Sequence, residues 1–219
     1  MVRRSLLTVV AFAGLGGAQA AEFRHISTSG YAAIALSGPI QRGDADRFRR
    51  TLAAVRDSEP GRPLLLLLQS PGGLIVEGTE IGLEARRNGV ATAAMGPCAS
   101  ACALAWLGGA SLWITPGSAI GFHASRTPEG ENAPMGDALV GHYVATLGFG
   151  PVVSMYATSV PHSAIRWLTP QDARQMGLQV SILQGDASRI AAAPSQPAPT
   201  ATALAAAPAR SARAAQAMR

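Results

Sequence analysis

The sequence predicts an α/β fold in which short buried strands alternate with amphipathic helices. Residues 64–68 are five consecutive leucines bounded on both sides by turn-forming residues. A short unbroken apolar run of this kind is typical of a strand buried on both faces. Phe48, Leu52 and Val55 recur at the spacing of one helical face, which predicts a helix before that strand. Further strand and helix signals alternate along the chain, as they do in α/β folds.

Each expected element has its own local signal. Strands are expected where apolar residues lie between turn signals, at 31–36, 64–68, 90–95, 111–115, 119–123 and 180–183. Asp44 is a suitable N-cap for a helix that reaches Val55, and a second helix is expected over residues 74–87. A turn and a helix follow within 96–109, and a last helix begins near Pro170. The helix before it has one apolar face, made by Met135, Leu139, Tyr143 and Leu147.

The two ends of the chain differ from the middle in composition. Residues 1–20 have two arginines, then an apolar run, then Ala18-Gln19-Ala20, which together resemble a secretory signal peptide with its cleavage site. A membrane anchor is disfavoured because the apolar run is short and rich in glycine. Residues 186–219 are rich in alanine and proline without an apolar period, which predicts a disordered tail. We therefore expect one domain over residues 21–185, exported to the periplasm or beyond, with no transmembrane span after signal cleavage.

The charge of the expected domain excludes one class of partner. The chain has 219 residues and a formal net charge of +5, and all 18 of its basic residues are arginine. That excess of positive charge lies in residues 1–20 and 186–219, while arginines and acids balance over residues 21–185. A domain without a basic excess is not expected to bind nucleic acid. The basic tail is expected to be a solvated segment.

Ser100 is the first candidate for chemistry. It lies in Gly96-Pro-Cys-Ala-Ser-Ala-Cys102, where a buried strand is expected to turn into a helix. A serine at such a place often caps the helix. It can equally be a nucleophile, because the unpaired N–H groups at a helix start stabilise negative charge. The local sequence is compatible with both roles.

Two further segments could complete a site. His123 ends the short apolar strand expected at 119–123, where an imidazole is well placed to act as a general base. Ser70-Pro71-Gly72-Gly73 follows the leucine strand, and its glycines allow the backbone to approach a ligand and direct N–H groups at it. Taken singly, these segments also fit a half-buried histidine and an ordinary turn.

Together, Leu68-Gln-Ser-Pro-Gly-Gly73, the segment around Ser100 and Ile120-Gly-Phe-His123 resemble the proteolytic subunit of Clp protease in order and approximate spacing. That family belongs to the ClpP/crotonase superfamily, and the resemblance covers roughly residues 31–183, including Trp167-Leu-Thr-Pro170. It is greatest to exported ClpP-like proteins of bacteria. The resemblance implies a superhelix of ββα units with C-terminal helices. It also implies that members self-associate, so a homo-oligomer is expected.

The resemblance implies a role for each site residue except one. Ser100 matches the nucleophile, His123 the general base, and the N–H groups of Gly73 and Ala101 the oxyanion hole. The family's aspartate is replaced by Ile165, so the third member of the triad is unknown. Asp172 is a poor substitute, because Thr169-Pro-Gln-Asp172 indicates a helix start. The acceptor for His123 could also be Glu129, Glu131, His162, Ser163 or a backbone carbonyl.

Two cysteines flank Ser100 at a spacing of four residues. On a helical turn, Cys98 and Cys102 are close enough for a disulfide, which export would permit. A pair of reduced, buried thiols is equally compatible with the sequence. Redox catalysis is disfavoured because the spacing is not C-x-x-C. A zinc site with His123 would lack a fourth ligand, so no metal and no cofactor are expected.

These observations predict a periplasmic ClpP-like serine hydrolase, a peptidase that uses Ser100 and His123 on a peptide or protein substrate. A Ser-Lys dyad is excluded because the chain contains no lysine. ATP-independent action is expected because the periplasm offers no ATP to an unfoldase. The alternative is a weakly active or inactive ClpP-like scaffold that binds peptides or protein partners. A crotonase-like acyl-CoA enzyme ranks third, since an exported protein would not meet coenzyme A.

Overall fold

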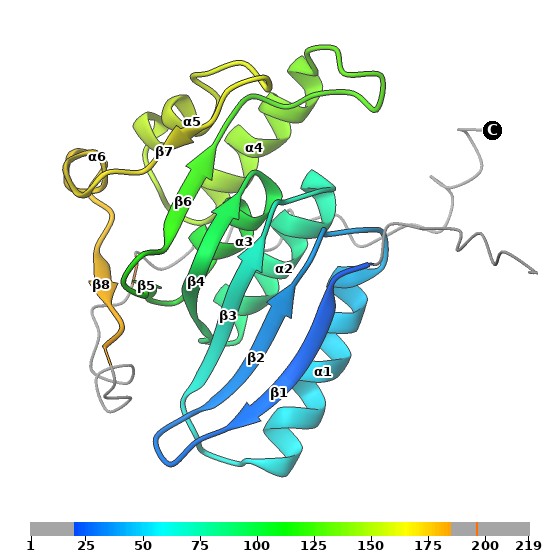
Figure 1. Cartoon of the computed structure of the whole chain (residues 1–219), viewed down its shortest axis with the longest axis vertical. Helices are drawn as coiled ribbons and strands as arrows, with labels where there is room; N and C mark the ends of the chain where they lie inside the picture. Colours follow the sequence, from blue (N-terminus) through cyan, green and yellow to red (C-terminus); the bar gives the residue numbers. More distant parts are fainter. Residues whose placement is uncertain (1–19, 185–195, 197–219) are drawn as a thin grey trace, which may run out of the picture.

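The computed structural model describes residues 20–184 and Gln196, and it confirms an α/β fold (Figure 1). The strands are β1 (Glu22–Ser27), β2 (Ala32–Ser37), β3 (Leu64–Ser70), β4 (Ala91–Ala99), β5 (Leu112–Ile114), β6 (Ala119–Phe122), β7 (Arg166–Trp167) and β8 (Val180–Ile182). The helices are α1 (Asp44–Ser58), α2 (Ile75–Arg87), α3 (Ala101–Leu107), α4 (Pro134–Thr146), α5 (Pro151–Ala157) and α6 (Pro170–Gln175).

The eight described strands form one sheet in the order β1-β2-β3-β4-β5-β8, and β6 branches from β4. Strand β1 is antiparallel to β2, whereas β2, β3, β4, β5 and β8 are parallel. Strand β6 runs parallel to β4 and carries the two-residue β7 antiparallel on its other side. The carboxyl ends of β3, β4 and β6 therefore point the same way, and in α/β sheets ligands bind at that edge.

Strand β4 pairs with two neighbours in succession, which produces the branch. Its first half pairs with β5 at Thr92–Ala94, and its last residues pair with β6 at Pro97–Ala99. Ser118 lies in the fork between these partners. Its hydroxyl donates to the carbonyl of Ala94 at 3.0 Å and accepts from the amide of Gly96 at 2.7 Å. The end of β4 is thereby directed away from β5 and toward β6.

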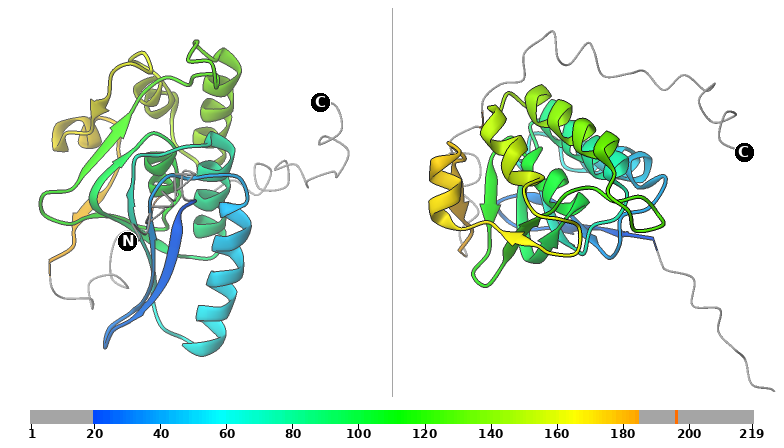
Figure 2. Two further views of the ribbon diagram at one scale, coloured as in Figure 1. Left: turned by 45° about the vertical axis from the view of Figure 1, so that its right-hand side comes forward. Right: turned by 90° about the horizontal axis from the view of Figure 1, so that it is seen from above.

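Helices α1, α2 and α3 cover one face of the sheet and enclose the main core (Figures 1 and 2). Helices α2 and α3 approach closely because glycines face their partners: a Cβ at Gly78 would overlap the Ala101 backbone. The buried guanidinium of Arg86 donates to the carbonyls of Gly108 and Leu107 at the end of α3, at 3.1 Å each. Helix α3 is thus held along its side by α2 and at its C-terminal end by Arg86. These contacts also fix the position of Ser100, which directly precedes the helix.

Some elements differ from the sequence expectations. Strand β1 was not expected, nor were α5 and β7 as separate elements, and β4 continues through Gly96-Pro97 to Ala99 instead of ending at residue 95. The expected signal peptide (1–20) and tail (186–219) lie almost entirely outside the described residues. Gln196 is an exception: it is buried, and its amide donates to the carbonyl of Ala110 at 2.8 Å. Across the described part of the chain, no helix is long and apolar enough to cross a membrane.

Candidate active site

Ser100 lies between β4 and α3 in a conformation that few residues adopt. Its φ is 57° and its ψ is −125°, and it is the one residue other than glycine with a positive φ in the described part of the chain. Such backbone conformations cost on the order of 1–3 kcal/mol and tend to occur at functional sites. A strained serine between a strand and a helix is also the arrangement of the nucleophile elbow in α/β-hydrolases.

The side chain of Ser100 is not used to cap α3. Ser100 occupies the N-cap position, but its hydroxyl makes no capping hydrogen bond. Its backbone is held by two bonds: its amide donates to Gly121 at 2.9 Å, and its carbonyl accepts from Leu104 at 3.2 Å. The capping role that the sequence left open is therefore wrong, and the half-buried hydroxyl is available for another role.

The Gly72-Gly73 turn after β3 packs directly against Ser100. A Cβ at Gly72 would lie 2.6 Å from the Ser100 Cβ and 2.6 Å from the Ala99 carbonyl oxygen, and Gly72 has a φ of 97°. Gly73 has a φ of 148°, and a Cβ there would overlap the backbone of Ile40. Both positions therefore require glycine, which alone combines these φ values with such close approach. The structure brings the segment from residue 70 to 73 to the serine, as the sequence predicted.

The amides of Gly73 and Ala101, which belong to segments beside Ser100, have no acceptor among the described residues. Gly73 forms a parallel bridge with Ile40, whose amide donates to Gly72 at 2.8 Å and whose carbonyl accepts from Leu74 at 3.0 Å. In such a bridge the N–H of the middle residue points to the opposite side. Since β4 lies on that side of β3 in the sheet, the Gly73 amide faces the Ser100 segment. The Ala101 amide is unpaired because it begins α3.

His123 reaches the same edge of the sheet from β6. Ala99 of β4 and Gly121 of β6 are register partners, so Ser100 and His123 both follow the carboxyl ends of adjacent parallel strands. The Nδ1 atom of His123 lies 2.7 Å from the carbonyl oxygen of Ala124. A carbonyl only accepts hydrogen bonds, so Nδ1 is the donor, and in the neutral tautomer that makes this bond the lone pair is on Nε2. That tautomer is the one a general base requires.

The position of the family's aspartate is apolar. Ile165 lies beside β6, where its Cγ2 is 2.5 Å from the site of a Cβ added at Gly121, next to the ring of Trp167. Both side chains are partly exposed. No carboxylate contacts the His123 ring within the described residues. Sequence reasoning named a carbonyl as one candidate acceptor but could not single out Ala124, because every residue carries a carbonyl.

Two of the three acidic candidates, Asp172 and Glu129, are engaged elsewhere. Asp172 forms a capping box with Thr169, as expected, and accepts a hydrogen bond from the Tyr156 hydroxyl at 3.1 Å. The hydrogen bond from the Thr169 hydroxyl contributes most to holding the pKa of Asp172 below its usual value. The pKa of Glu129 is also lowered, by its own backbone amide and by Thr127, on the exposed loop after β6.

His162 belongs to a turn that lies against the residue after His123. The amide of Ala124 donates to the carbonyl of Val160 at 2.7 Å, and Ala164 closes the turn by donating to Pro161 at 2.9 Å. The Nδ1 atom of His162 is buried and has no hydrogen-bond partner among the described residues. The turn therefore supports the Ala124 backbone, and its contribution to the His123 site is made through that backbone.

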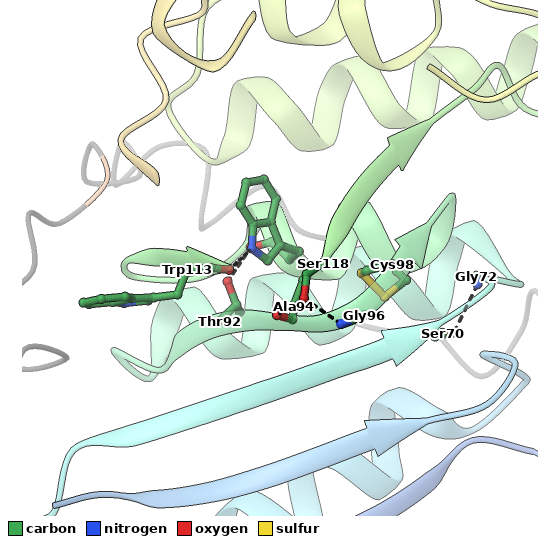
Figure 3. The surroundings of a disulfide bond; sticks show 10 residues. Ser70, Gly72, Thr92, Ala94, Gly96, Cys98, Trp113 and Ser118 are labelled. Atoms are coloured by element: carbon green, nitrogen blue, oxygen red, sulfur yellow. Dashed lines mark hydrogen bonds between the residues drawn. A yellow bond between two sulfur atoms is a disulfide. The ribbon is translucent and has the colours of Figure 1, made fainter. Parts of the chain in front are cut away.

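Cys98 and Cys102 form a disulfide across the Ser100 turn (Figure 3), which decides between the bonded and the reduced pair that the sequence allowed. Their Cα atoms are 5.2 Å apart, and both side chains are fully buried. Because both sulfurs are bonded, neither is available as a thiol or as a zinc ligand.

Comparisons with known proteins agree with this fold. The family model of Clp protease matches residues 25–131, a segment that includes Gly73, Ser100 and His123. No curated protein sequence matches the chain. A mutant of ClpP1 from Listeria monocytogenes has a TM-score of 0.54 and 16% identity, over 70% of this chain and 91% of its own. A mutant of the membrane-bound stomatin-specific protease 1510-N has a TM-score of 0.52 and 17% identity, over 69% and 77%. Both likenesses concern the fold.

Proposed function

The chain belongs to the ClpP/crotonase superfamily, and we propose that it is a serine peptidase in which Ser100 is the nucleophile and His123 the general base. The observation that carries this proposal is the strained turn at Ser100. Its hydroxyl is not used for capping, and two unpaired amides lie beside it. A purely structural turn would have no reason to keep a serine at a positive φ with its helix uncapped.

The proposed reaction is acyl transfer in two steps. The Oγ atom of Ser100 attacks the substrate carbonyl, and its proton passes to Nε2 of His123. The tetrahedral oxyanion accepts hydrogen bonds from the amides of Gly73 and Ala101, whose stabilisation of such a charge is commonly worth about 3–4 kcal/mol. His123 then gives its proton to the leaving amine, and the acyl-enzyme is hydrolysed by water that His123 activates.

The proposed catalytic group is a Ser100–His123 dyad in which the Ala124 carbonyl orients the histidine. The Ala124 oxygen sets the tautomer of His123 and accepts from Nδ1 at 2.7 Å. A neutral carbonyl stabilises the imidazolium less than a carboxylate does, because it carries no full charge. We therefore propose a slower enzyme than one with a complete Ser-His-Asp triad.

We further propose that the enzyme works outside the cytoplasm and without ATP. The Cys98–Cys102 disulfide supports export, since such bonds are rare where thiols are kept reduced. The signal-like residues 1–20 support it as well. An ATP-driven unfoldase would have no ATP outside the cytoplasm, so the substrates proposed are peptides or unfolded protein segments.

Labelling with a fluorophosphonate tests the assignment. This electrophile reacts with an activated serine, so the wild type is expected to be labelled and Ser100→Ala to remain unlabelled. His123→Ala should slow labelling by on the order of 10²–10⁴-fold, the usual contribution of a general base. Ser154→Ala, on α5 and away from the site, serves as the control and should react like the wild type. Equal labelling of the wild type and Ser100→Ala would refute the assignment, and no labelling of either would favour the non-catalytic scaffold.

A further inference from the structure

We propose that the Cys98–Cys102 disulfide is a clamp that positions Ser100, and that the peptidase reaches full activity only after this bond has formed. This inference rests on the proposed function, since it concerns the same nucleophile. The disulfide would then be part of the catalytic arrangement and also the feature that keeps the enzyme inactive before export.

The bond joins two firmly held segments on either side of the nucleophile. Cys98 belongs to β4 (Figure 3), where it pairs with Ser70 of β3 and Ile120 of β6. Cys102 is the second residue of α3, which Arg86 fixes at its far end. Three residues lie within the closed loop, and the middle one is Ser100. The loop therefore contains the proposed nucleophile together with one proposed oxyanion donor, the amide of Ala101.

Without the disulfide, the strained conformation of Ser100 would depend on two backbone hydrogen bonds and on the contact with Gly72. Its positive φ is unfavourable for a residue with a Cβ, and its hydroxyl does not cap α3. Two backbone hydrogen bonds remain, to Gly121 and Leu104. Helix α3 has only seven residues, too few to be stable by its own hydrogen bonds. Relaxation of this turn toward a negative φ would move both the Ser100 hydroxyl and the Ala101 amide.

Such a movement would also change the spacing of the two proposed oxyanion donors. The place where a Gly72 Cβ would be is only 2.6 Å from the Ser100 Cβ and 3.0 Å from the Ala101 nitrogen. The two oxyanion donors therefore belong to backbones in direct contact, and a shift of one changes its distance from the other. A misplacement of about 1 Å can lower a reaction rate by on the order of 100-fold.

The burial of the bond argues for a lasting clamp. Both cysteine side chains are fully buried, so a reductant cannot reach the sulfurs of the folded protein. The bond forms during folding, when the two thiols pass two electrons and two protons to a disulfide-exchange oxidant, whose own disulfide becomes a dithiol. In a reducing cytoplasm the thiols would stay separate, and the nucleophile would lack its clamp.

The test compares oxidised and reduced protein folded from the same chain. Wild type and Cys98→Ala/Cys102→Ala are each folded with oxidised glutathione and with an excess of reductant. Fluorophosphonate labelling then gives two quantities: the fraction of sites that react at completion, and the rate constant for each reacting site. The first reports how much protein is folded, and the second reports how well Ser100 is positioned. Circular dichroism and thermal melting report the fold independently.

The clamp predicts a change in the rate constant alone. Reduced wild type and the double variant should label 10- to 100-fold more slowly per site than oxidised wild type, on the order expected for a displaced nucleophile. Their completed fraction and circular dichroism should stay unchanged. Refolding with oxidised glutathione should restore the wild type and leave the double variant slow. If the double variant does not fold, Cys98→Val/Cys102→Ala, which replaces more of the lost volume, takes its place.

Two outcomes would overturn the clamp while leaving the proposed function intact. One is an equal rate constant in oxidised and reduced protein. The other is a lower completed fraction with an unchanged rate constant, which would mean that the bond only stabilises the fold. The absence of Ser100-dependent labelling in oxidised wild type would instead refute the proposed function, and this inference with it.

Discussion

The backbone conformation of Ser100 indicates a role that its position at a helix start does not. A serine at the start of a helix is ordinarily a cap, yet here the hydroxyl makes no capping bond and the backbone has a φ of 57°. The residues around it are small because the space is occupied by backbone: Gly72 faces Ser100 at a distance that excludes any side chain. The energetic cost of this turn is offset by neighbours that hold it, which is expected where conformation serves chemistry.

Ile165 is the residue that most clearly separates this site from a complete triad. Gly121 pairs with Trp167 and Phe122 with Arg166, so the same register places Ile165 opposite His123. Partners in an antiparallel pair project to the same face, which is close enough for contact. An acid introduced at this position would therefore lie on the same side of the sheet as the His123 ring.

We expect Ile165→Asp to accelerate labelling of Ser100 by about tenfold or more, because a carboxylate stabilises the imidazolium that forms when the serine loses its proton. Ile165→Asn, equal in size but neutral, should label at the wild-type rate and is the matched control. Rate constants from fluorophosphonate labelling measure both. If the two variants behave alike, the missing acid does not limit the reaction.

Strand β4 is the element that places the proposed nucleophile, because it changes partners along its length. The change occurs at Met95–Pro97, where β3 has a single residue opposite three. Ser118 satisfies the backbone groups freed there, with Thr115 bonded to the same Ala94 carbonyl at 3.2 Å. Since Ser100 follows directly on the redirected end of β4, the fork sets its position relative to β6.

We expect Ser118→Ala to lower the free energy of unfolding by about 1–3 kcal/mol, because it leaves the Gly96 amide without its partner in a half-buried position. Labelling of Ser100 should also slow, since the end of β4 loses its support. Thr115→Val is the control: it removes the neighbouring hydroxyl, with its 2.7 Å contact to the Ser118 hydroxyl, but leaves the Ser118 bonds to Gly96 and Ala94 in place. Chemical denaturation and labelling rates measure the two effects. An unfolding free energy for Ser118→Ala no lower than that of Thr115→Val would contradict this role of the fork.

The elements that the sequence predicted are specified by local patterns, whereas the elements it missed depend on contacts with distant parts of the chain. The leucine run of β3 and the apolar faces of α1 and α4 are local signals, and each element was confirmed. Strand β1 was missed because most of it is exposed, with Phe23 as its main contact, stacked on Phe48 at 6.2 Å. The end of β4 was expected to be a turn because of Gly96-Pro97, whose extended conformation depends on pairing with β6. Such tertiary effects leave no local pattern.

In the candidate site, too, local features could be predicted from the sequence and long-range contacts could not. The glycines and the serine could be singled out from the sequence because the roles proposed for them require particular residue types. The Ala124 carbonyl could not be singled out, because its role depends on where the backbone runs rather than on the side chain. The disulfide was one of two possibilities in the sequence, since the spacing permits the bond without requiring it. Geometry that depends on long-range pairing therefore marks the limit of prediction from the sequence.

At the scale of the whole molecule, several apolar side chains on α4 and α5 are exposed to solvent. Met155 is 70% exposed and Val152 55% exposed on α5, and Met135 is 83% exposed on α4. Helices α4 and α5 contact each other, at one end of the molecule (Figure 1). Exposed apolar side chains on neighbouring helices are candidates for a protein interface. Together with the self-association implied by the family resemblance, they support the proposal of a homo-oligomer.

We expect light scattering to give the protein a mass of more than one protomer. Val152→Glu/Met155→Glu should lower that mass, because two buried carboxylates would destabilise an apolar interface. Labelling of Ser100 by fluorophosphonate should change little, since α5 contributes no residue to the proposed oxyanion hole or base. Arg174→Glu/Gln175→Glu on α6 also places two carboxylates on an exposed helix, so it controls for added charge and should leave the mass unchanged. A wild type with the mass of a single protomer would rule out the oligomer, and an unchanged mass in the α5 variant would move the interface away from α5.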